Sequence, residues 1–205
     1  MKGQLALIAA LALAANAFAA DSEKGFKPLF NGKDTNGWHL RRADGHNSWS
    51  AKDGVLQNTV NPGEHGTDLV TNEKFWNFTV RYEYMVPDGS NSGFYLRGRH
   101  ELQILGDFMS GKPAKNGNGS IYNFKAPDEF ISKRGDEWQT VEATIIGNKI
   151  TVIQNGVKIH DNVECKVATG SEIDNKIDQP GPIFLQGDHG TVAFRNIRIK
   201  VLPKE

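Results

Sequence analysis

The strongest constraint on the fold is a two-residue alternation of apolar and polar side chains between Phe75 and Val86. The apolar members of this stretch share one face, and they are Trp76, Phe78, Val80, Tyr82, Tyr84 and Val86. Such alternation is typical of a strand in an antiparallel sheet that is buried on one side only. No amphipathic helix pattern follows the first twenty residues, so the sequence predicts an all-β chain.

Turn signals divide the remainder of the chain into short strands. Residues 87–91 form a turn cluster, and a second continuous strand is expected from Gly93 to Leu105. Gly147-Asn148 and Asn155-Gly156 each suit a tight hairpin turn. Further strands are expected over 138–146, 149–154, 157–159, 183–186 and 192–202. Many short strands without helices between them indicate a sandwich or a barrel, and the patternless stretch 107–136 predicts a long loop.

The first twenty residues resemble a secretory signal. Lys2 supplies a positive start, residues 5–15 are apolar, and Ala17-Phe18-Ala19 fits the small-residue cleavage rule. The alternative is a membrane anchor, but the apolar run is short for crossing a bilayer. We therefore expect a cleaved signal over 1–20, a single domain over 21–205, export to the periplasm or the medium, and no membrane association after cleavage.

Composition and motifs exclude several classes of function. Lys plus Arg and Asp plus Glu both number 24, which argues against a nucleic-acid partner. Cys165 is the only cysteine, so no intrachain disulfide or CxxC site can form, and we expect a structural thiol. No metal ligands are assigned because no paired Cys/His spacing or HExxH motif is present. The sequence requires no cofactor, although it leaves a divalent metal open.

Three clusters of polar residues are candidates for a site. On one continuous strand, Asn91, Tyr95, Arg97, Arg99, Glu101 and Gln103 would share a face. Desolvating such a row is costly, so it lies either on plain surface or in a wet, concave site, and its Arg, Glu and Gln content favours a site. Gln186 and His189 form the second cluster with Asp188, where flanking glycines leave the imidazole open to titrate near neutral pH. Tyr122, in the long loop, either contacts a sugar or anchors the loop.

Motifs along the whole mature chain resemble the 3-keto-disaccharide hydrolase family. The resemblance begins at residues 25–34 and Gly37-Trp38 and ends at residues 194–199. Between them it includes Asn91-Ser92-Gly93, Glu101 to Gln103, Gly119 to Tyr122, Glu137-Trp138, Asn155-Gly156, Gly181-Pro182-Ile183 and His189-Gly190. This resemblance implies a concanavalin-like jelly-roll sandwich of two antiparallel sheets with a concave ligand face. It also implies that the substrates are glycosides oxidised to a ketone at C3 and that the glycosidic bond is cleaved.

The carboxylates of the chain suggest how such a bond would be cleaved. Glucanases of this fold carry a Glu-x-Asp-x-Glu type strand, whereas the comparable strand here has Gln103 at the Asp position and no second Glu after Glu101. A double displacement by two carboxylates from this strand is therefore not expected. A 3-keto group instead acidifies the proton at C2. A base can then form an enolate that expels the anomeric substituent, and water adds afterwards.

Each candidate residue has an expected role in that chemistry. Glu101 and His189 would act as base and acid, in an order that the sequence does not fix. Arg97 and Gln103 would stabilise the oxyanion. The residues expected to hold sugar hydroxyls are Gln186, Tyr122, Asn91 and Glu83. We expect a carbohydrate as substrate and no obligate protein partner.

Two other functions remain open at this level. A non-catalytic carbohydrate-binding module would use the same fold and predicts an exposed, planar strip of aromatic side chains. A structural or adhesive sandwich predicts that the polar residues are scattered. The enzyme hypothesis predicts a recessed pocket on which Arg97, Glu101, Gln103 and His189 converge.

Overall fold

The computed structural model describes residues 23–61 and 63–204, so the expected signal over 1–20 lies outside the described residues. The strands are β1 (Lys27–Pro28), β2 (Trp38–Leu40), β3 (Trp49–Lys52), β4 (Val55–Asn58), β5 (Leu69–Thr71), β6 (Phe78–Met85), β7 (Asn91–Leu96), β8 (His100–Leu105), β9 (Gln139–Ile146), β10 (Lys149–Gln154), β11 (Val157–Glu164), β12 (Phe184–Leu185) and β13 (Val192–Val201). A short 3₁₀ helix, η1, covers Phe108–Ser110. Within the described ranges, no helix has the length and apolar character needed to cross a membrane.

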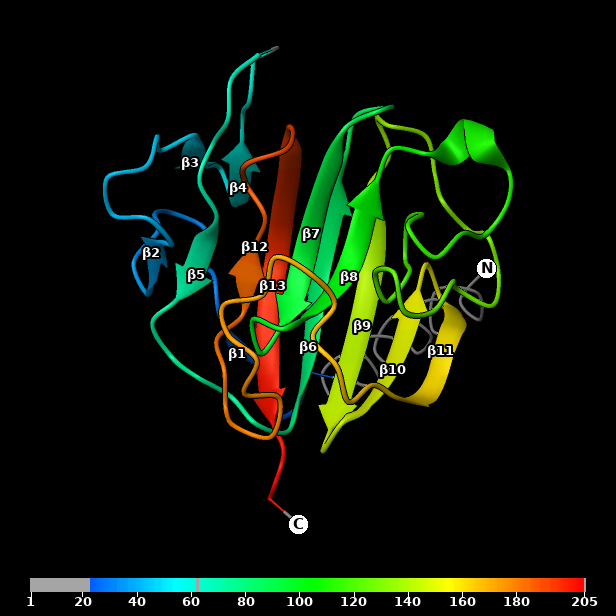
Figure 1. Cartoon of the computed structure of the whole chain (residues 1–205). Coiled ribbons are helices and arrows are strands. Elements are labelled where there is room, and N and C mark those ends of the chain that lie inside the picture. The colour runs from blue at the N-terminus through cyan, green and yellow to red at the C-terminus, as the bar shows by residue number, and fades with distance from the viewer. Residues whose placement is uncertain (1–22, 62, 205) are drawn as a thin grey trace, which may run out of the picture.

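The strands form two antiparallel sheets that pack face to face (Figure 1). One sheet has eight strands in the order β11-β10-β9-β6-β13-β4-β3, with β1 paired to β13. The other has five strands in the order β2-β5-β12-β7-β8. The predicted jelly-roll sandwich is confirmed, because neighbouring strands in both sheets are antiparallel and the apolar core lies between them.

The alternating strand β6 explains how the two sheets are joined. Its apolar side chains are buried between the sheets, while Thr79, Arg81, Glu83 and Met85 point to the outer face of the eight-stranded sheet. Tyr82 of β6 stacks on Phe94 of β7, with ring centroids 3.9 Å apart and planes 3° apart. Each ring belongs to a different sheet, so this pair connects the two layers at the middle of the core.

The expected continuous strand from Gly93 to Leu105 is wrong, because the chain reverses in its middle. Strands β7 and β8 form a hairpin whose turn contains Arg97 and Gly98, both with positive φ (55° and 68°). The reversal pairs Tyr95 with Glu101 and Gly93 with Gln103. Glu101 and Gln103 therefore remain on the face of Tyr95, whereas Arg97 leaves that row.

The other hairpin predictions are confirmed. Gly147-Asn148 joins β9 to β10, and Asn155-Gly156 joins β10 to β11 with both residues at positive φ. Cys165 follows β11 directly and is a buried, free thiol. Trp38 and Trp49 are core residues. Trp138 is not, because it lies half-buried under the guanidinium of Arg195.

The long loop 107–136 is held against the sandwich by buried polar groups. The Tyr84 hydroxyl donates to Oδ1 of Asn118 at 2.9 Å, and Nε2 of Gln154 donates to the Tyr84 hydroxyl at 3.1 Å. Asn118 also donates to the hydroxyl of Ser132 at 3.0 Å. Buried, satisfied hydrogen bonds of this kind fix a loop in one position, so this loop is part of the framework around β8.

Removing the ring of Phe94 should destabilise the whole sandwich. Phe94→Ala leaves a cavity opposite Tyr82 at the junction of the sheets, and we expect it to lower the free energy of unfolding by about 3–5 kcal/mol. Urea unfolding followed by circular dichroism measures this change. Val201→Ala, at an exposed position, is the control and should change stability by less than about 0.5 kcal/mol. Equal effects of the two substitutions would contradict this account of the core.

Candidate active site

The candidate site lies on the outer face of the five-stranded sheet. The strand register sets Val70, Phe184, Tyr95 and Glu101 in one row across β5, β12, β7 and β8. The next row runs from Gln186 through Gly93 to Gln103. The Gln186 N–H donates to the carbonyl of Gly93, and Gly93 pairs with Gln103. Asp68, directly before β5, continues this second row beside Gln186. We call the row of Asp68, Gln186, Gly93 and Gln103 the floor of the site.

The carboxylate of Glu101 lies over Gly93. A Cβ atom at position 93 would collide with Oε1 of Glu101 and come within 3.0 Å of the Tyr95 ring. The Tyr95 hydroxyl donates to Oε2 of Glu101 at 2.7 Å, and the side chain of Thr169 accepts the Glu101 backbone N–H at 2.8 Å. With only 3% of Glu101 exposed, its carboxylate is recessed into the sheet and held in one orientation.

Burial raises the pKa of Glu101 from its ordinary value of 4.5 to about 7. The hydrogen bond from Tyr95 and the nearby His189 lower this pKa, while the charges of Asp188 and Asp68 raise it. A carboxyl group with this pKa is divided between its acid and base forms near neutral pH. It can therefore accept or donate a proton at the pH where most enzymes work.

Side-chain amides around Glu101 have buried atoms without a partner. These atoms are Oε1 of Gln103, Oε1 of Gln186 and Oδ1 of Asn91. Nε2 of Gln103 donates to the carbonyl of Asn116 at 3.3 Å, which orients that amide from behind. Buried polar atoms are nearly always hydrogen-bonded, and leaving one unpaired costs about 1–3 kcal/mol. Three such atoms around one carboxylate are suited to bind a ligand rich in hydroxyl groups.

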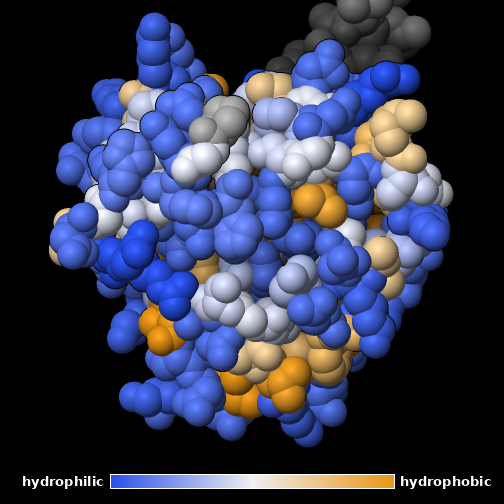
Figure 2. Space-filling view, turned by 45° about the horizontal axis from the view of Figure 1, so that its top comes forward, coloured by the Kyte–Doolittle hydropathy of each residue, from blue (hydrophilic) through white to orange (hydrophobic). Residues whose placement is uncertain are grey.

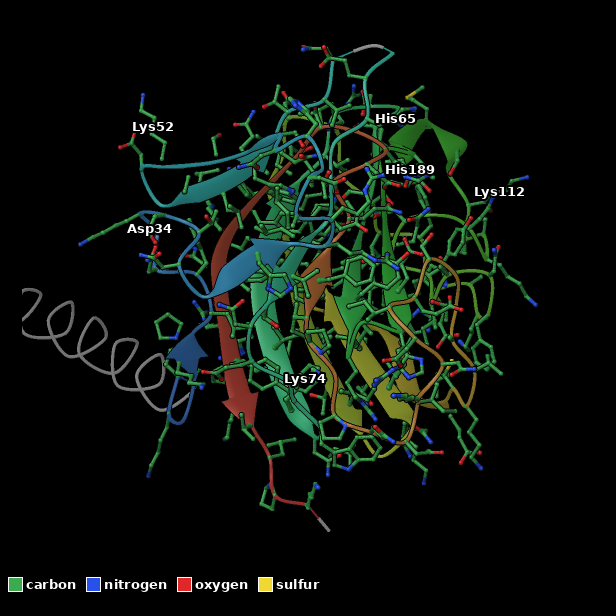
Figure 3. All side chains as sticks on the ribbon, turned by 60° about the vertical axis from the view of Figure 1, so that its left-hand side comes forward. Asp34, Lys52, His65, Lys74, Lys112 and His189 are labelled. Atoms are coloured by element: carbon green, nitrogen blue, oxygen red, sulfur yellow. The ribbon has the colours of Figure 1, made fainter. Side chains whose placement is uncertain are left out.

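The bend over 187–190 forms one rim of the site. Nδ1 of His189 lies 2.5 Å from Oδ1 of Asp188, and Nδ1 of His65 lies 3.1 Å from the Asp188 carbonyl oxygen. Figure 3 shows His65 and His189 close together at the same end of the molecule. About half of the His189 side chain is exposed (49%), so the imidazole is open to solvent while it also influences the pKa of Glu101.

A cavity of about 530 Å³ opens beside this rim, and the described residues that line it are Arg41, Arg42, His65, Thr67, Asp68 and Asp188. Its lining is polar and charged. Figure 2, in which the top of Figure 1 comes forward, shows that hydrophilic residues cover most of this end of the molecule. A cavity of this size falls in the range of small-molecule sites.

Asp68 is a second carboxyl group of the site, and the sequence analysis missed it. The Gly187 N–H donates to its Oδ1 at 3.0 Å, and Arg41 donates to its Oδ2 at 3.2 Å. Burial is the largest cause of a raised pKa of Asp68, and the charge of Asp188 adds to it. The pairing of β5 with β12 brings Asp68 to the floor. No local sequence pattern around Asp68 indicates that it lies at the floor.

A segment between β11 and β12 covers the row that contains Phe184 and Tyr95. Arg41 donates to the carbonyl oxygens of Ser171 and Glu172 at 2.7 and 2.8 Å, and Asp174 pairs with Arg99 at 2.6 Å. In Figure 1 this segment, drawn in orange, crosses in front of the five-stranded sheet. We call residues 169–179 the covering segment. Together with its neighbours it leaves Tyr95 and Phe184 fully buried.

Five of the eight predicted site residues gather around the floor: Asn91, Glu101, Gln103, Gln186 and His189. Tyr122 lies close to them. Its N–H donates to the Glu101 carbonyl at 3.0 Å, and its half-buried ring lies near Gly170, beside the covering segment.

The predicted positions of Arg97 and Glu83 are wrong. Arg97 is fully buried in the hairpin turn, with its guanidinium 4.0 Å from the centre of the Trp76 ring, and it donates to the carbonyl of Ile177 at 3.2 Å. Glu83 points outward from β6 on the opposite sheet, where it binds Arg195 and Asn196. The turn removes Arg97 from the floor. The alternation of β6 sends Glu83 to the far side of the sandwich.

Arg99 was also expected on the shared face, but it holds the covering segment instead. It pairs with Asp174 and donates to the carbonyl of Gln179 at 2.8 Å. Across residues 23–61 and 63–204, no group of three or more His, Cys, Asp or Glu side chains is arranged to hold a metal ion.

Comparisons with known proteins identify the family and the fold of this chain. Residues 25–200 match the profile of the 3-keto-alpha-glucoside-1,2-lyase-like domain. A 3-keto-disaccharide hydrolase of Bacteroides thetaiotaomicron is 29% identical over 87% of this chain and 79% of its own length. A candidate glycosyl hydrolase from Parabacteroides distasonis has a similar structure, with a TM-score of 0.70, 27% identity and coverage of 87% of this chain and 84% of its own. A Flavobacterium laminarinase shares the fold alone, at a TM-score of 0.54 and 11% identity over 85% of this chain and 98% of its own.

Two substitutions should move the pKa of Glu101 in opposite directions. Gly93→Ala places a methyl group where Oε1 lies and pushes the carboxylate toward solvent, so we expect the pKa to fall from about 7 toward 4.5. Tyr95→Phe removes the hydrogen bond that favours the ionised form, so the pKa should rise. Carboxyl ¹³C NMR titration measures both shifts, and shifts of the same sign would contradict the geometry.

Glu101 should also make stability depend on pH. The native state keeps this proton up to about pH 7, while the unfolded chain releases it near pH 4.5. The stability contributed by Glu101 is therefore fully present below pH 4.5 and is lost as the pH rises through 7. Relative to Glu101→Gln, the wild type should lose up to about 3 kcal/mol of unfolding free energy between pH 4.5 and 8. Urea unfolding across this range tests the effect, and parallel curves for the two proteins would contradict it.

Proposed function

The chain belongs to the family of the 3-keto-alpha-glucoside-1,2-lyase-like domain, and we propose that it cleaves the glycosidic bond of 3-keto-glycosides. The matches to a 3-keto-disaccharide hydrolase and to a candidate glycosyl hydrolase support this substrate class. The observation that carries the proposal is the recessed carboxylate of Glu101. It has a pKa of about 7 and is surrounded by unpaired amide atoms.

In the proposed reaction, Glu101 is the base that removes the proton from C2. A base for this step works best when its pKa is close to the working pH, because it is then ionised and still basic. The proton passes to Oε1 or Oε2 of Glu101, and the electrons of the C–H bond form an enolate with the C3 carbonyl. The enolate collapses, the C1–O bond breaks, and water adds to the resulting enone.

The amide side chains of the floor suit the rest of the substrate. Gln103 and Gln186 lie on either side of Gly93. Nε2 of Gln186 can donate to the enolate oxygen, while the unpaired Oε1 atoms of both residues can accept hydrogen bonds from neighbouring hydroxyls. The sequence predicted that Arg97 and Gln103 stabilise the enolate oxygen. Because Arg97 lies outside the site, neutral donors stabilise this oxygen in the proposed reaction. Removing one well-placed donor to a developing oxyanion costs about 3–4 kcal/mol of transition-state stabilisation.

His189 is suited to exchange protons between the site and solvent. It is half exposed, is oriented by Asp188, and lies near enough to influence the pKa of Glu101. Protonated Glu101 has to return its proton to C2 when water adds. A solvent-facing imidazole beside it keeps the protonation states in equilibrium.

The geometry does not favour the rival function of a non-catalytic sugar-binding module. Such a module would present flat aromatic side chains on this face, but Tyr95 and Phe184 stack on each other and are fully buried. The polar side chains of the floor, together with Glu101 in the neighbouring row, are carboxyls and amides. A catalytic function fits these groups better than aromatic stacking on a glycan.

Replacing the carboxylate should abolish the reaction. For Glu101→Gln we expect kcat/KM with a 3-keto-glucoside to fall by about 10²–10⁴-fold, with the fold intact because the amide has the same size. Release of the aglycone from purified protein measures the rate. In the wild type, kcat/KM should rise with pH through an apparent pKa near 7, since the base must be ionised. Unchanged turnover in the variant would exclude Glu101 from the mechanism.

A further inference from the structure

We propose that Asp68 is the acid that protonates the leaving group, and that the leaving group occupies the cavity lined by Asp68, Asp188 and the two arginines 41 and 42. This inference rests on the proposed cleavage of 3-keto-glycosides. It adds a second catalytic carboxyl and assigns a position to the aglycone. Asp68 directly precedes β5, which lies three places from the Glu101 strand β8 in the sheet order, with β12 and β7 between them.

The register of the sheet sets the spacing between the two carboxyl groups. Asp68 and Gly93 are separated in the floor by Gln186, so their backbones lie two strand spacings apart, or about 10 Å. The carboxylate of Glu101 reaches back over Gly93, where no side chain competes for space. The two carboxyl groups thus lie on either side of Gln186 on the same face of the sheet.

This placement suits the two reacting atoms of the substrate. C1 and C2 are neighbours in the ring, so a ring over Gln186 with C2 toward Glu101 can direct its C1–O bond toward Asp68. The atoms beyond that bond then enter the cavity of about 530 Å³ that Asp68 lines. The cavity is large enough for a further sugar, and its charged lining matches hydroxyl groups.

Glu101 and Asp68 together account for every proton that is transferred in the reaction. Glu101 takes the proton from C2 as the enolate forms. When C1–O breaks and C1=C2 forms, the Asp68 carboxyl gives its proton to the departing oxygen and becomes a carboxylate. Water then adds its oxygen to C1 and a proton to Asp68, while Glu101 returns its proton to C2. Both residues end in their starting states, and the net reaction is hydrolysis.

Asp68 is better placed for this step than His189 or Asp188. Its side chain is 10% exposed and is held by Gly187 and Arg41, whereas the side chains of His189 and Asp188 are 49% and 41% exposed at the rim. Burial also raises the pKa of Asp68, which increases the fraction that carries a proton. The hydrogen bonds from the Gly187 N–H to Oδ1 and from Arg41 to Oδ2 lower this pKa, but burial outweighs them.

Leaving groups of different acidity test the assignment. A 4-nitrophenolate leaves without a proton, whereas methanol needs one. For Asp68→Asn we expect kcat/KM to fall at least about 100-fold with methyl 3-keto-glucoside but to stay within about tenfold with the 4-nitrophenyl 3-keto-glucoside. Asp68→Glu keeps a carboxyl group and should partly restore cleavage of the methyl glucoside. Asp188→Asn is the matched control and should affect both substrates to the same extent.

The outcomes separate this inference from the proposed function. If the wild type cleaves neither substrate, the proposed function itself is wrong. If Asp68→Asn loses both activities equally while Asp68→Glu restores neither, Asp68 has a structural role and the inference is wrong. If the selective loss appears with Asp188→Asn instead, the acid is Asp188 and the assignment to Asp68 is overturned.

Discussion

The close contact between the Glu101 carboxylate and Gly93 is the constraint on which the site depends. A carboxylate on the face of a sheet normally extends into water, but here the missing side chain at position 93 lets it lie against the backbone. The Tyr95 hydroxyl holds it there, and burial brings its pKa to about 7. One glycine on β7 therefore determines both the position and the proton affinity of the central group.

The sandwich supports this arrangement from both sides. Beneath the site, the stacked pair Tyr82 and Phe94 joins the sheets and fixes β7, which carries Gly93 and Tyr95. Above it, the covering segment excludes water from Tyr95 through its links to Arg41 and Arg99. The recessed carboxylate thus depends on packing in the core and on ion pairs outside it. This combination explains why residues from distant parts of the chain are needed to build one small site.

The sequence predicted what depends on local pattern and missed what depends on strand pairing. Alternation identified β6, Gly-Asn pairs located the hairpin turns, and clusters of polar residues on the expected strands pointed to Glu101, Gln103 and Gln186. Arg97 was misplaced because a turn of Arg97 and Gly98 carries no proline or Asn-Gly signal, so one strand was expected where two exist. Asp68 was missed because only the pairing of β5 with β12 brings it to the floor.

Solvent exchange at C2 tests the role of Glu101 most directly. The 3-keto derivative of 1,5-anhydroglucitol has no leaving group, so an enzyme that removes the C2 proton can only exchange it with the solvent. In D₂O, the wild type should incorporate deuterium at C2, as seen by ¹H NMR, and Glu101→Gln should not. Equal exchange by both proteins would contradict the account, as would a wild type that cleaves 3-keto-glycosides without any exchange at C2.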